Sequence, residues 1–481
     1  MTTRGAVGAL DAIVVGAGPN GLAGAIELAR AGRSVRIYEA AETVGGGTRS
    51  AELTLPGFVH DVCSAAHPLG MASPFFRSLD LARHGLEWVQ PDAPLAQALA
   101  PGRTVVLERD LSMMRESLGI DGAAWSRLFG PLTRESERLV PMVLRPVMRP
   151  PRHPVLLARF GLPALLPATM LARLAFREPA ARALFAGIVA HSMLRLDRPL
   201  TASFGLLMGT LAHAVGWPLA RGGSGRVAAA LEAEARELGV DIVTGHRVRS
   251  LAELPNARVV VLDLTPRQVV EIAGDRLTGS YRQALERYRY GPAVFKVDWA
   301  LDGPIPWSDP ATARAGTVHL GGTMAEVAAS EDAVAHGRVA DRPFVLLVQP
   351  TIADPSRAPA GKHIAWAYAH IPSASTFDLT AAIEAQVERF APGFRDLILA
   401  RRTADAQAME AYDANYVGGD INGGLQDVRQ LLFRPVMRWN PYTTPDPGLF
   451  LCSSSTPPGG GVHGMSGMLG AREAERWLRR G

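Results

Sequence analysis

The stretch DAIVVGAGPNGLAGAIELARAGRSVRIYEA, residues 11–40, restricts the fold of this chain more than any other feature of the sequence. Residues 13–15 form a short apolar run that leads into glycines, which is typical of a buried parallel strand. Residues 22–31 supply a helix, and residues 35–38 a second strand. This order predicts a β-turn-α-β unit at the start of an α/β fold.

Three glycines form a GxGxxG turn between the first strand and the helix. Gly16 permits a tight turn, Gly18 lets the backbone approach a pyrophosphate, and Gly21 lets the helix and strand pack closely. The phosphates then face the positive end of the helix, and we include Asn20 in this site. Glu39 lies about 20 residues further on, where a carboxylate accepts hydrogen bonds from an adenosine ribose. We therefore predict a Rossmann-type dinucleotide-binding domain.

The size and composition of the chain set wider limits. A length of 481 residues favours two connected domains. The net charge of +4 gives no sign of a nucleic-acid partner. Cys63 and Cys452 are the only cysteines, which predicts neither a disulfide framework nor a metal site, and favours a reducing compartment. No cleavable signal and no run of ~20 apolar residues is recognised, so a cytoplasmic location is expected.

The residues after Glu39 carry the first family resemblance. AAETVGGGTRS, residues 40–50, resembles the Glu-x(5)-Gly-Gly extension of the two-dinucleotide-binding-domain flavoproteins, which include amine oxidases and phytoene desaturases. The resemblance implies that Gly45 and Gly46 lie against FAD. Many relatives have an arginine next, whereas this chain has Gly47, with Arg49 two residues on. Whether Arg49 replaces the missing contact stays open, and an ordinary glycine loop is the alternative.

Three later segments make the resemblance more specific. Residues 216–248 are similar to the segment by which phytoene-desaturase-like flavoproteins return to the FAD domain. Residues 354–372 and 441–467 resemble a narrower branch, which includes the mammalian pyridine nucleotide-disulphide oxidoreductase domain-containing protein 2. The sequence has neither a CxxxxC redox pair nor a second β-turn-α-β unit that carries a GxGxxG turn, so no nicotinamide site is expected.

The resemblance also implies further FAD-binding residues. Ser454 and Ser455 would lie near the ribityl and pyrophosphate groups, and a helix beginning near Gly464 would direct its N–H groups at the flavin. By hydrophobic pattern alone, residues 246–251 and 257–266 are two buried strands. FAD is expected to be bound non-covalently. The set taken from the resemblance is Ala66, Val248, Ser454, Ser455, Gly464 and Met465.

Histidines are the candidates for proton transfer, because their side chains titrate near neutral pH. His67 falls where relatives bring the chain past the flavin, and His463 lies in the flavin-closing turn. For both, a hydrogen-bonded structural role is the alternative. His191 and His213 are expected to pack or cap helices. Lys296 resembles a lysine near the flavin in amine oxidases, but alternation within a strand explains it better.

Residues 138–177 contain seven arginines and seven prolines and no acidic residue. One interpretation is peripheral contact with the inner face of a membrane, with arginines meeting anionic headgroups. The other is a proline-broken helical segment packed on the core or at a homodimer interface. On the first interpretation, the apolar residues that enter the lipid are Leu156, Leu157, Phe160, Leu165 and Leu166.

Taken together, these features predict an FAD-binding domain built from residues 1–70, 218–272 and 440–481. Residues 71–217 and 273–439 would form a mixed α+β substrate domain. The expected reaction is hydride transfer from a hydrophobic organic substrate to flavin N5, with reoxidation by oxygen or a quinone. One rival is an amine oxidase, for which Trp439 and Tyr442 would supply the aromatic residues beside the flavin. A flavin-stabilised, non-catalytic interaction protein is the other.

Overall fold

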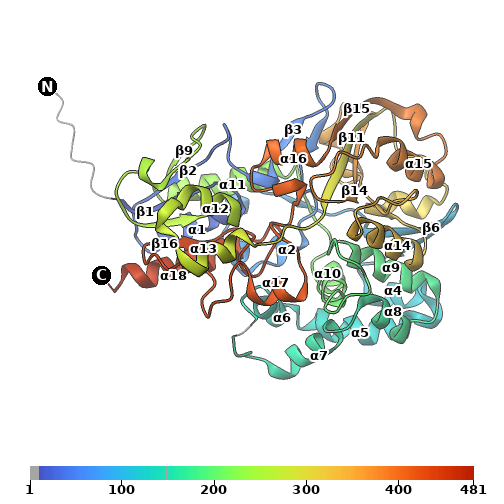
Figure 1. The fold of residues 1–481 in the computed structure, drawn as a ribbon. Coiled ribbons are helices and arrows are strands. Elements are labelled where there is room, and N and C mark those ends of the chain that lie inside the picture. The colour runs from blue at the N-terminus through green and yellow to red at the C-terminus, as the bar shows by residue number, and fades with distance from the viewer. Residues whose placement is uncertain (1–9, 148, 481) are drawn as a thin grey trace.

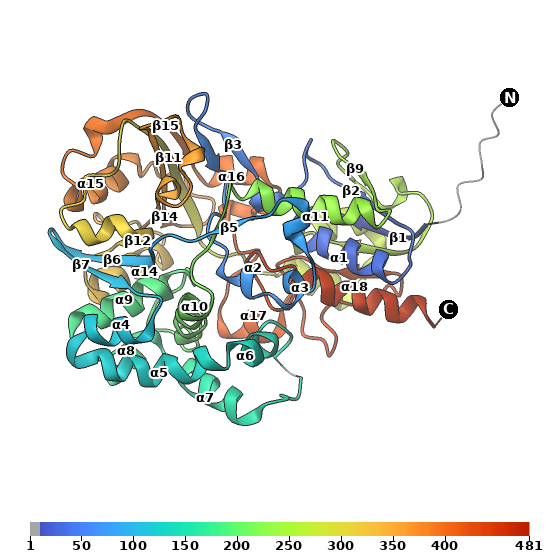
Figure 2. The ribbon, with the colours of Figure 1, turned by 180° about the vertical axis from the view of Figure 1, so that it is seen from behind.

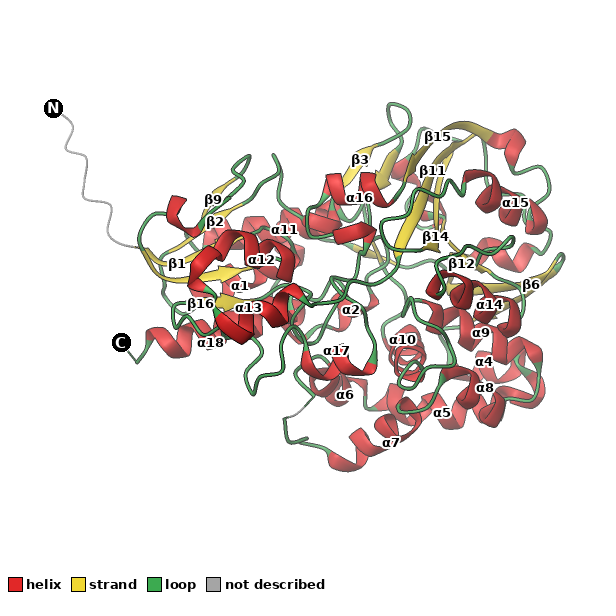
Figure 3. Ribbon diagram, viewed as in Figure 1, coloured by secondary structure: helices red, strands yellow, loops and turns green. Residues whose placement is uncertain are grey.

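Two β-sheets organise the chain (Figures 1 and 3). The computed structural model describes residues 10–147 and 149–480. The first sheet is parallel and is drawn from the three segments expected to bind the dinucleotide. Its strand order is β16 (Leu449–Leu451), β10 (Ala257–Leu262), β1 (Leu10–Val15), β2 (Val35–Tyr38) and β9 (Asp241–Val243).

Strand β1 is apolar from Ala12 to Val15 because both of its faces are buried there. Ala12 and Val14 point into one core and Ile13 and Val15 into another, as the alternation of side chains along a strand requires. The first core is covered by α1 (Pro19–Arg30), α11 (Gly225–Glu237) and α18 (Met465–Leu478), which lie in front in Figure 2. The second is covered by α12 (Pro266–Ala273) and α13 (Gly279–Glu286), in front in Figure 1.

The layer around the parallel sheet extends beyond the segments expected for it. Phe75 and Phe76 of α3 (Pro74–Arg77) pack into the first core, and Tyr281 and Leu285 of α13 into the second. These residues were assigned to the substrate domain. They are recruited because a sheet that is apolar on both faces needs helices on both faces.

The second sheet is mixed. Its order is β15 (Ile398–Ala404), β11 (Ala293–Leu301), β14 (His363–Ile371), β13 (Val345–Val348), β12 (Ala315–Leu320), β6 (Ala93–Ala100) and β7 (Arg103–Leu107). Only β12 and β6 are parallel neighbours within it. One face packs on α15 (Thr380–Phe390), and the other on α5 (Gly122–Arg134), α9 (Pro179–Ala190) and α10 (Ala202–Ala214).

The arginine-rich segment is helical, with α6 (Ser136–Val143), α7 (Pro154–Ala164) and α8 (Ala168–Ala175). Leu156 and Phe160 are buried because that side of α7 packs on the core with α5 and α10, and Leu157 and Leu166 are partly buried there. Of the five residues expected to enter lipid, Leu165 alone is well exposed. The exposed apolar side chains of this region are Val147, Val155, Leu162, Leu165, Met170 and Leu174.

Within the described ranges, no helix by itself is long and apolar enough to cross a bilayer. The pair α7 and α8, bent by 102°, reaches that length and composition only when taken together.

One strand assignment was wrong. Residues 246–251 lack strand structure, and the strand that precedes them is β9. Residues 246–251 have no strand to pair with, because residues 241–243 already occupy the edge position beside β2. Further elements are β4 (Val59–Asp61), β5 (Trp88–Val89), α4 (Leu111–Ser117), η8 (Pro355–Arg357), α16 (Ala406–Tyr412) and α17 (Val428–Phe433).

Candidate functional site

A cavity of about 1530 Å³ is lined by residues of both sheets. Sites for single small molecules span roughly 300–1,000 Å³, so this volume fits a dinucleotide together with a second molecule. Most of the expected site residues line it: Gly16, Gly18, Asn20, Glu39, Gly46, Gly47, Arg49, Ala66, His67, Val248, Ser454 and His463.

The glycine turn has the geometry that the sequence predicts. Gly16 has a φ of +100°, and a Cβ on Gly21 would lie 2.0 Å from the Gly16 carbonyl oxygen. Only glycine fits such a turn without strain. Helix α1 begins at Pro19, directly after Gly18, so its N-terminal end lies at the cavity.

Asp263, which follows β10, also faces this turn. Its Oδ2 accepts a hydrogen bond of 2.7 Å from the Gly21 N–H, and the residue lines the cavity. Burial, reinforced by Asp413 and Glu39, raises the pKa of Asp263 to about 7. This residue was not predicted from the sequence. Its signal was an acidic side chain at the carboxyl end of a strand, the edge where α/β sheets bind ligands.

Glu39 is fixed by its own loop. Its Oε2 accepts from the Ala17 N–H at 2.7 Å and its Oε1 from the Ala41 N–H at 2.9 Å. Arg49 lies 3.3 Å from the same Oε1 and donates to the Thr43 carbonyl at 2.7 Å. The guanidinium of Arg49 therefore holds the Glu39 carboxylate and the glycine loop together at the cavity.

Tyr416 explains the departure at Gly47. A Cβ on Gly47 would lie 2.2 Å from the Tyr416 hydroxyl oxygen, so the space that an arginine side chain would need is filled. The Tyr412 hydroxyl donates to the Gly46 carbonyl at 2.7 Å. Both tyrosines line the cavity, and neither was identified from sequence, because no local pattern connects them to the glycine loop.

The two candidate catalytic histidines have structural hydrogen bonds. The Ser224 hydroxyl donates to the Ser64 carbonyl at 2.5 Å, so the Nε2–H of His67 must donate to that hydroxyl, 2.8 Å away. His463 accepts from the Met465 N–H at Nδ1, 3.0 Å, and its Nε2–H donates to the Gly459 carbonyl, 3.2 Å. His463 therefore has no ring nitrogen free to exchange a proton. Burial lowers the pKa of each ring to about 4.

The C-terminal helix begins at Met465, as expected. It packs so closely on α1 that a Cβ on Gly467 would lie 1.9 Å from the Asn20 carbonyl oxygen. Five expected cofactor residues lie behind the cavity lining instead of in it: Gly21, Gly45, Ser455, Gly464 and Met465. Ser455, for example, turns away because its hydroxyl donates to the Gly423 carbonyl at 2.7 Å.

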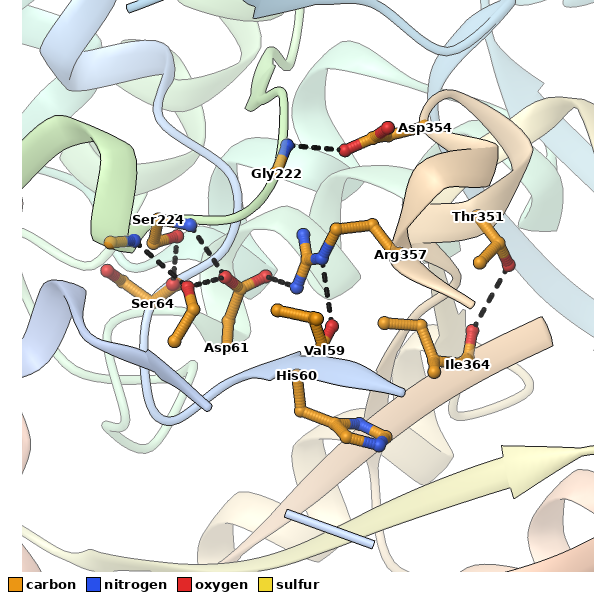
Figure 4. A network of polar contacts seen from close by, with 12 residues as sticks. Val59, His60, Asp61, Ser64, Gly222, Ser224, Thr351, Asp354, Arg357 and Ile364 are labelled. Carbon is orange, nitrogen blue, oxygen red and sulfur yellow. Dashed lines mark hydrogen bonds and ion pairs between the residues drawn. The ribbon is translucent and has the colours of Figure 1, made fainter. Parts of the chain in front are cut away.

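A buried polar network joins the two parts of the molecule at one side of the cavity (Figure 4). Asp61 of β4 and Arg357 of η8 form an ion pair at 3.1 Å, each about 1% exposed. Asp61 also accepts from the Ser224 N–H at 2.7 Å, which fixes the partner of His67. Although burial alone would raise it, Arg357 holds the pKa of Asp61 below its usual range.

The remaining expectations concern side chains near the substrate region. Lys296 is buried in β11 beside Asp298, with its ammonium 4.9 Å from the Trp366 ring, and does not line the cavity. Trp439 is 84% exposed and Tyr442 is fully buried, so this pair does not flank the site. The aromatic residues that do line the cavity include Trp217, Trp366, Tyr368, Tyr412 and Tyr416.

His191 and His213 differ from each other. His213 is buried in α10 and accepts a 2.9 Å hydrogen bond from the indole N–H of Trp125, which agrees with a packing role. His191 is the C-cap residue of α9, as expected, and it also lines the cavity.

Comparisons with known proteins agree with this architecture. A profile for an NAD(P)-binding Rossmann-like domain matches residues 14–79. The pyridine nucleotide-disulfide oxidoreductase domain-containing protein 2 of Rattus norvegicus is 26% identical over 98% of this chain and 94% of its own length. Hydroxyneurosporene desaturase of Cereibacter sphaeroides is 32% identical over 49% of each chain. Cyclohexylamine oxidase of Brevibacterium oxydans has a TM-score of 0.60 at 16% identity, covering 98% of this chain and 99% of its own.

The class is therefore that of the oxidoreductases with a Rossmann-like dinucleotide-binding domain and a large second domain, and the fold is similar to that of cyclohexylamine oxidase. Within this class, the chain is a homologue of pyridine nucleotide-disulfide oxidoreductase domain-containing protein 2. The fold class and the branch expected from the motifs are both confirmed.

Proposed function

We propose that this protein is an FAD-dependent oxidoreductase that removes a hydride and a neighbouring proton from a hydrophobic organic substrate. The observation that carries the proposal is the shared cavity. The glycine turn and Glu39 line its dinucleotide end, and residues of the mixed sheet line the rest. FAD is favoured over a nicotinamide because the GxGxxG turn at residues 16–21 is followed by the matching Glu-x(5)-Gly-Gly extension.

The residues present fit FAD. The N-terminal end of α1 is placed for the pyrophosphate, and the carboxylate of Glu39 for the adenosine ribose. Gly46 approaches Gly18 so closely that its Cβ would lie 3.2 Å from the Gly18 Cα, and both glycines line the cavity. When bound, the flavin supplies the two-electron acceptor, and the protein positions the substrate and excludes water. We propose oxygen or a quinone as the final oxidant.

The substrate region is apolar and aromatic. It is lined by Leu207, Met208, Trp217, Leu346, Val348 and Trp366, among others. The acidic residues in the lining are Glu39, Asp263, Glu271 and Asp413. All four lie at the dinucleotide end of the cavity: the first three belong to the parallel-sheet side, and Asp413 lies beside Gly46. This distribution favours an uncharged substrate over a cationic amine, because a buried cation needs a counter-charge.

The decisive experiment is anaerobic mixing of the purified protein with lipophilic alcohols, polyenes and amines. Bleaching of the flavin absorption band by an alcohol or a polyene supports the proposal. Bleaching by amines alone would favour the amine oxidase, whose case is strengthened by the stacked Trp366 and Tyr368, with ring centroids 5.9 Å apart. If none of the three classes reduces the flavin, the non-catalytic interaction protein becomes the better interpretation.

FAD is expected to be bound without a covalent link, because no Cys or His lies at a position that the family resemblance would make a flavin attachment site. Acid denaturation should release yellow FAD into the supernatant, identified by chromatography. Flavin that remains with the precipitated chain would contradict this expectation.

We also propose peripheral contact of residues 138–177 with the inner face of an anionic membrane. Val147, Leu162 and Leu165 are exposed and line the cavity, so an apolar substrate entering there would leave lipid directly. Exposed arginines accompany them, among them Arg152 and Arg159, each worth about 1 kcal/mol at an anionic surface.

Sedimentation with anionic liposomes tests the membrane contact. Binding should fall but not vanish at high salt, because salt screens exposed charges and not apolar contacts. The double substitution Leu162→Asp and Leu165→Asp should lower it further while FAD is retained. Met113→Asp, at an exposed apolar residue of α4 elsewhere, is the matched control. A wild-type protein that stays in the supernatant at low salt would instead indicate a subunit interface, which sedimentation velocity would show as a homodimer.

A further inference from the structure

A polar chain runs from the interior of the mixed sheet to the cavity. His319 of β12 lies beside Gln97 of β6 in the parallel pair, and both are fully buried. Nε2 of His319 lies 3.1 Å from Nε2 of His191. His191 follows α9 one helical turn after Gly187, so both residues lie on the same face of the helix. His191 is the member of this chain that lines the cavity.

The missing side chain at Gly187 brings two polar atoms together. A Cβ there would lie 2.1 Å from Oε1 of Gln97 and 2.6 Å from Nδ1 of His319. Both atoms are buried and have no hydrogen-bond partner among the described residues. The two atoms do not form a hydrogen bond with each other, but they lie close to the same point above Gly187. The Gln97 oxygen can only accept, so the tautomer that suits this pair is the one with the proton on Nδ1 of His319.

The backbone carbonyl of Gly322 fixes which groups donate and which accept along this polar chain. The amide nitrogen of Gln97 donates to the Gly322 carbonyl oxygen at 3.0 Å, so its oxygen must point the other way, toward His319. With the proton of His319 on Nδ1, its Nε2 is an acceptor, and Nε2–H of His191 must donate to it. Nδ1 of His191 is then an unprotonated acceptor, and it is the nitrogen left for a molecule in the cavity.

We propose that His191 is a specificity-determining residue that accepts a hydrogen bond from the hydroxyl group of an otherwise apolar substrate. The inference rests on the proposed function in taking the apolar part of the cavity as the substrate site. The surroundings fit one polar group, because His191 lies 5.8 Å from the Trp217 ring and shares the lining with Leu346 and Val348. A site built to bind a hydroxyl discriminates strongly against analogues that lack it.

His191 accepts a hydrogen bond from the hydroxyl group and does not act as a general base. Burial, and to a lesser degree the nearby His370, lowers the pKa of His191 to about 3. A general base at neutral pH needs a pKa near 7, whereas a hydrogen-bond acceptor needs only to stay unprotonated. His319, whose pKa burial also lowers, acts as a positioning residue that fixes the tautomer.

Equilibrium binding of three probes of equal size tests the inference by calorimetry: decanol, nonyl methyl ether and methyl octyl ketone. Only decanol carries a donor, so it should bind the FAD-loaded wild type about tenfold more tightly than the other two. In His191→Phe, which keeps the ring and removes the acceptor, the three affinities should become equal. In His319→Leu, the ring of His191 is free to take either tautomer, and the preference for decanol over the ketone should shrink.

Equal binding of all three probes to the wild type, no binding of any, or a preference for the ketone would overturn the inference. Retention of the decanol preference in His191→Phe would do so as well. Nitrogen NMR of histidine-labelled wild type gives a test without variants, and protonation of His191 at Nδ1 would be contrary to the chain described above. None of these measurements needs turnover. If the protein discriminates between the probes but no substrate reduces its flavin, the inference about His191 stands and the proposed function is wrong.

Discussion

Glu39→Ala is expected to purify with little FAD. The substitution removes charge-assisted hydrogen bonds to the ribose, worth roughly 1.5–3 kcal/mol, or about tenfold to a hundredfold in affinity. The N–H groups of Ala17 and Ala41 also lose their acceptor, and Arg49 loses its carboxylate partner. Flavin absorbance relative to protein absorbance measures the occupancy.

Two further variants control for this result. Glu39→Gln keeps one side-chain oxygen as an acceptor and should retain more FAD than the alanine variant. Glu42→Ala removes an exposed carboxylate three residues away that does not line the cavity, and should bind FAD as the wild type does. Full occupancy in Glu39→Ala would mean that the ribose partner has been assigned to the wrong residue.

The second large effect is on the pH dependence of FAD affinity. Asp263 has its pKa raised to about 7 by burial and by the negative charges of Asp413 and Glu39. A pyrophosphate at the glycine turn adds negative charge, raises that pKa further, and so binds best when Asp263 is protonated. Affinity should therefore be highest below pH 7 and should fall above it, by up to about tenfold per pH unit.

Asp263→Asn should remove this dependence. The amide oxygen of asparagine can still accept from the Gly21 N–H, but the side chain carries no charge at any pH. Fluorescence titration of the apoprotein with FAD from pH 6 to pH 9 should give a nearly constant affinity, about tenfold above the wild type at pH 8. Glu271→Gln, at an exposed carboxylate in the same cavity, should leave the wild-type profile unchanged. A wild-type affinity that rises with pH would refute the argument.

Asp263 changes the pH dependence of folding stability in the opposite direction to most acidic residues. Because the pKa of Asp263 is higher in the folded chain than in the unfolded one, the folded apoprotein binds the extra proton between about pH 4 and pH 7. Its stability should decrease as the pH rises through that range. Thermal unfolding of Asp263→Asn should show a smaller decrease.

The sequence alone determined what depends on short-range backbone geometry. The turn needs Gly21 because a Cβ there would lie 2.0 Å from the Gly16 oxygen. The strand at residues 35–38 and the helix beginning at Met465 were confirmed, as was the fold class. Each of these follows from residue types within about thirty positions of one another, which is the range over which periodicity and glycine placement carry information.

Only the tertiary structure decided how distant side chains meet. Asp263 reaches Gly21 across 242 positions, and Tyr412 reaches Gly46 across 366. The sequence showed that Gly47 departs from the family pattern, but only the position of Tyr416 supplied the reason. His191 was expected to pack or cap a helix and is the C-cap of α9, but only the register of β6 against β12 shows that it ends a polar chain. Such contacts depend on strand register and side-chain direction, which no local pattern contains.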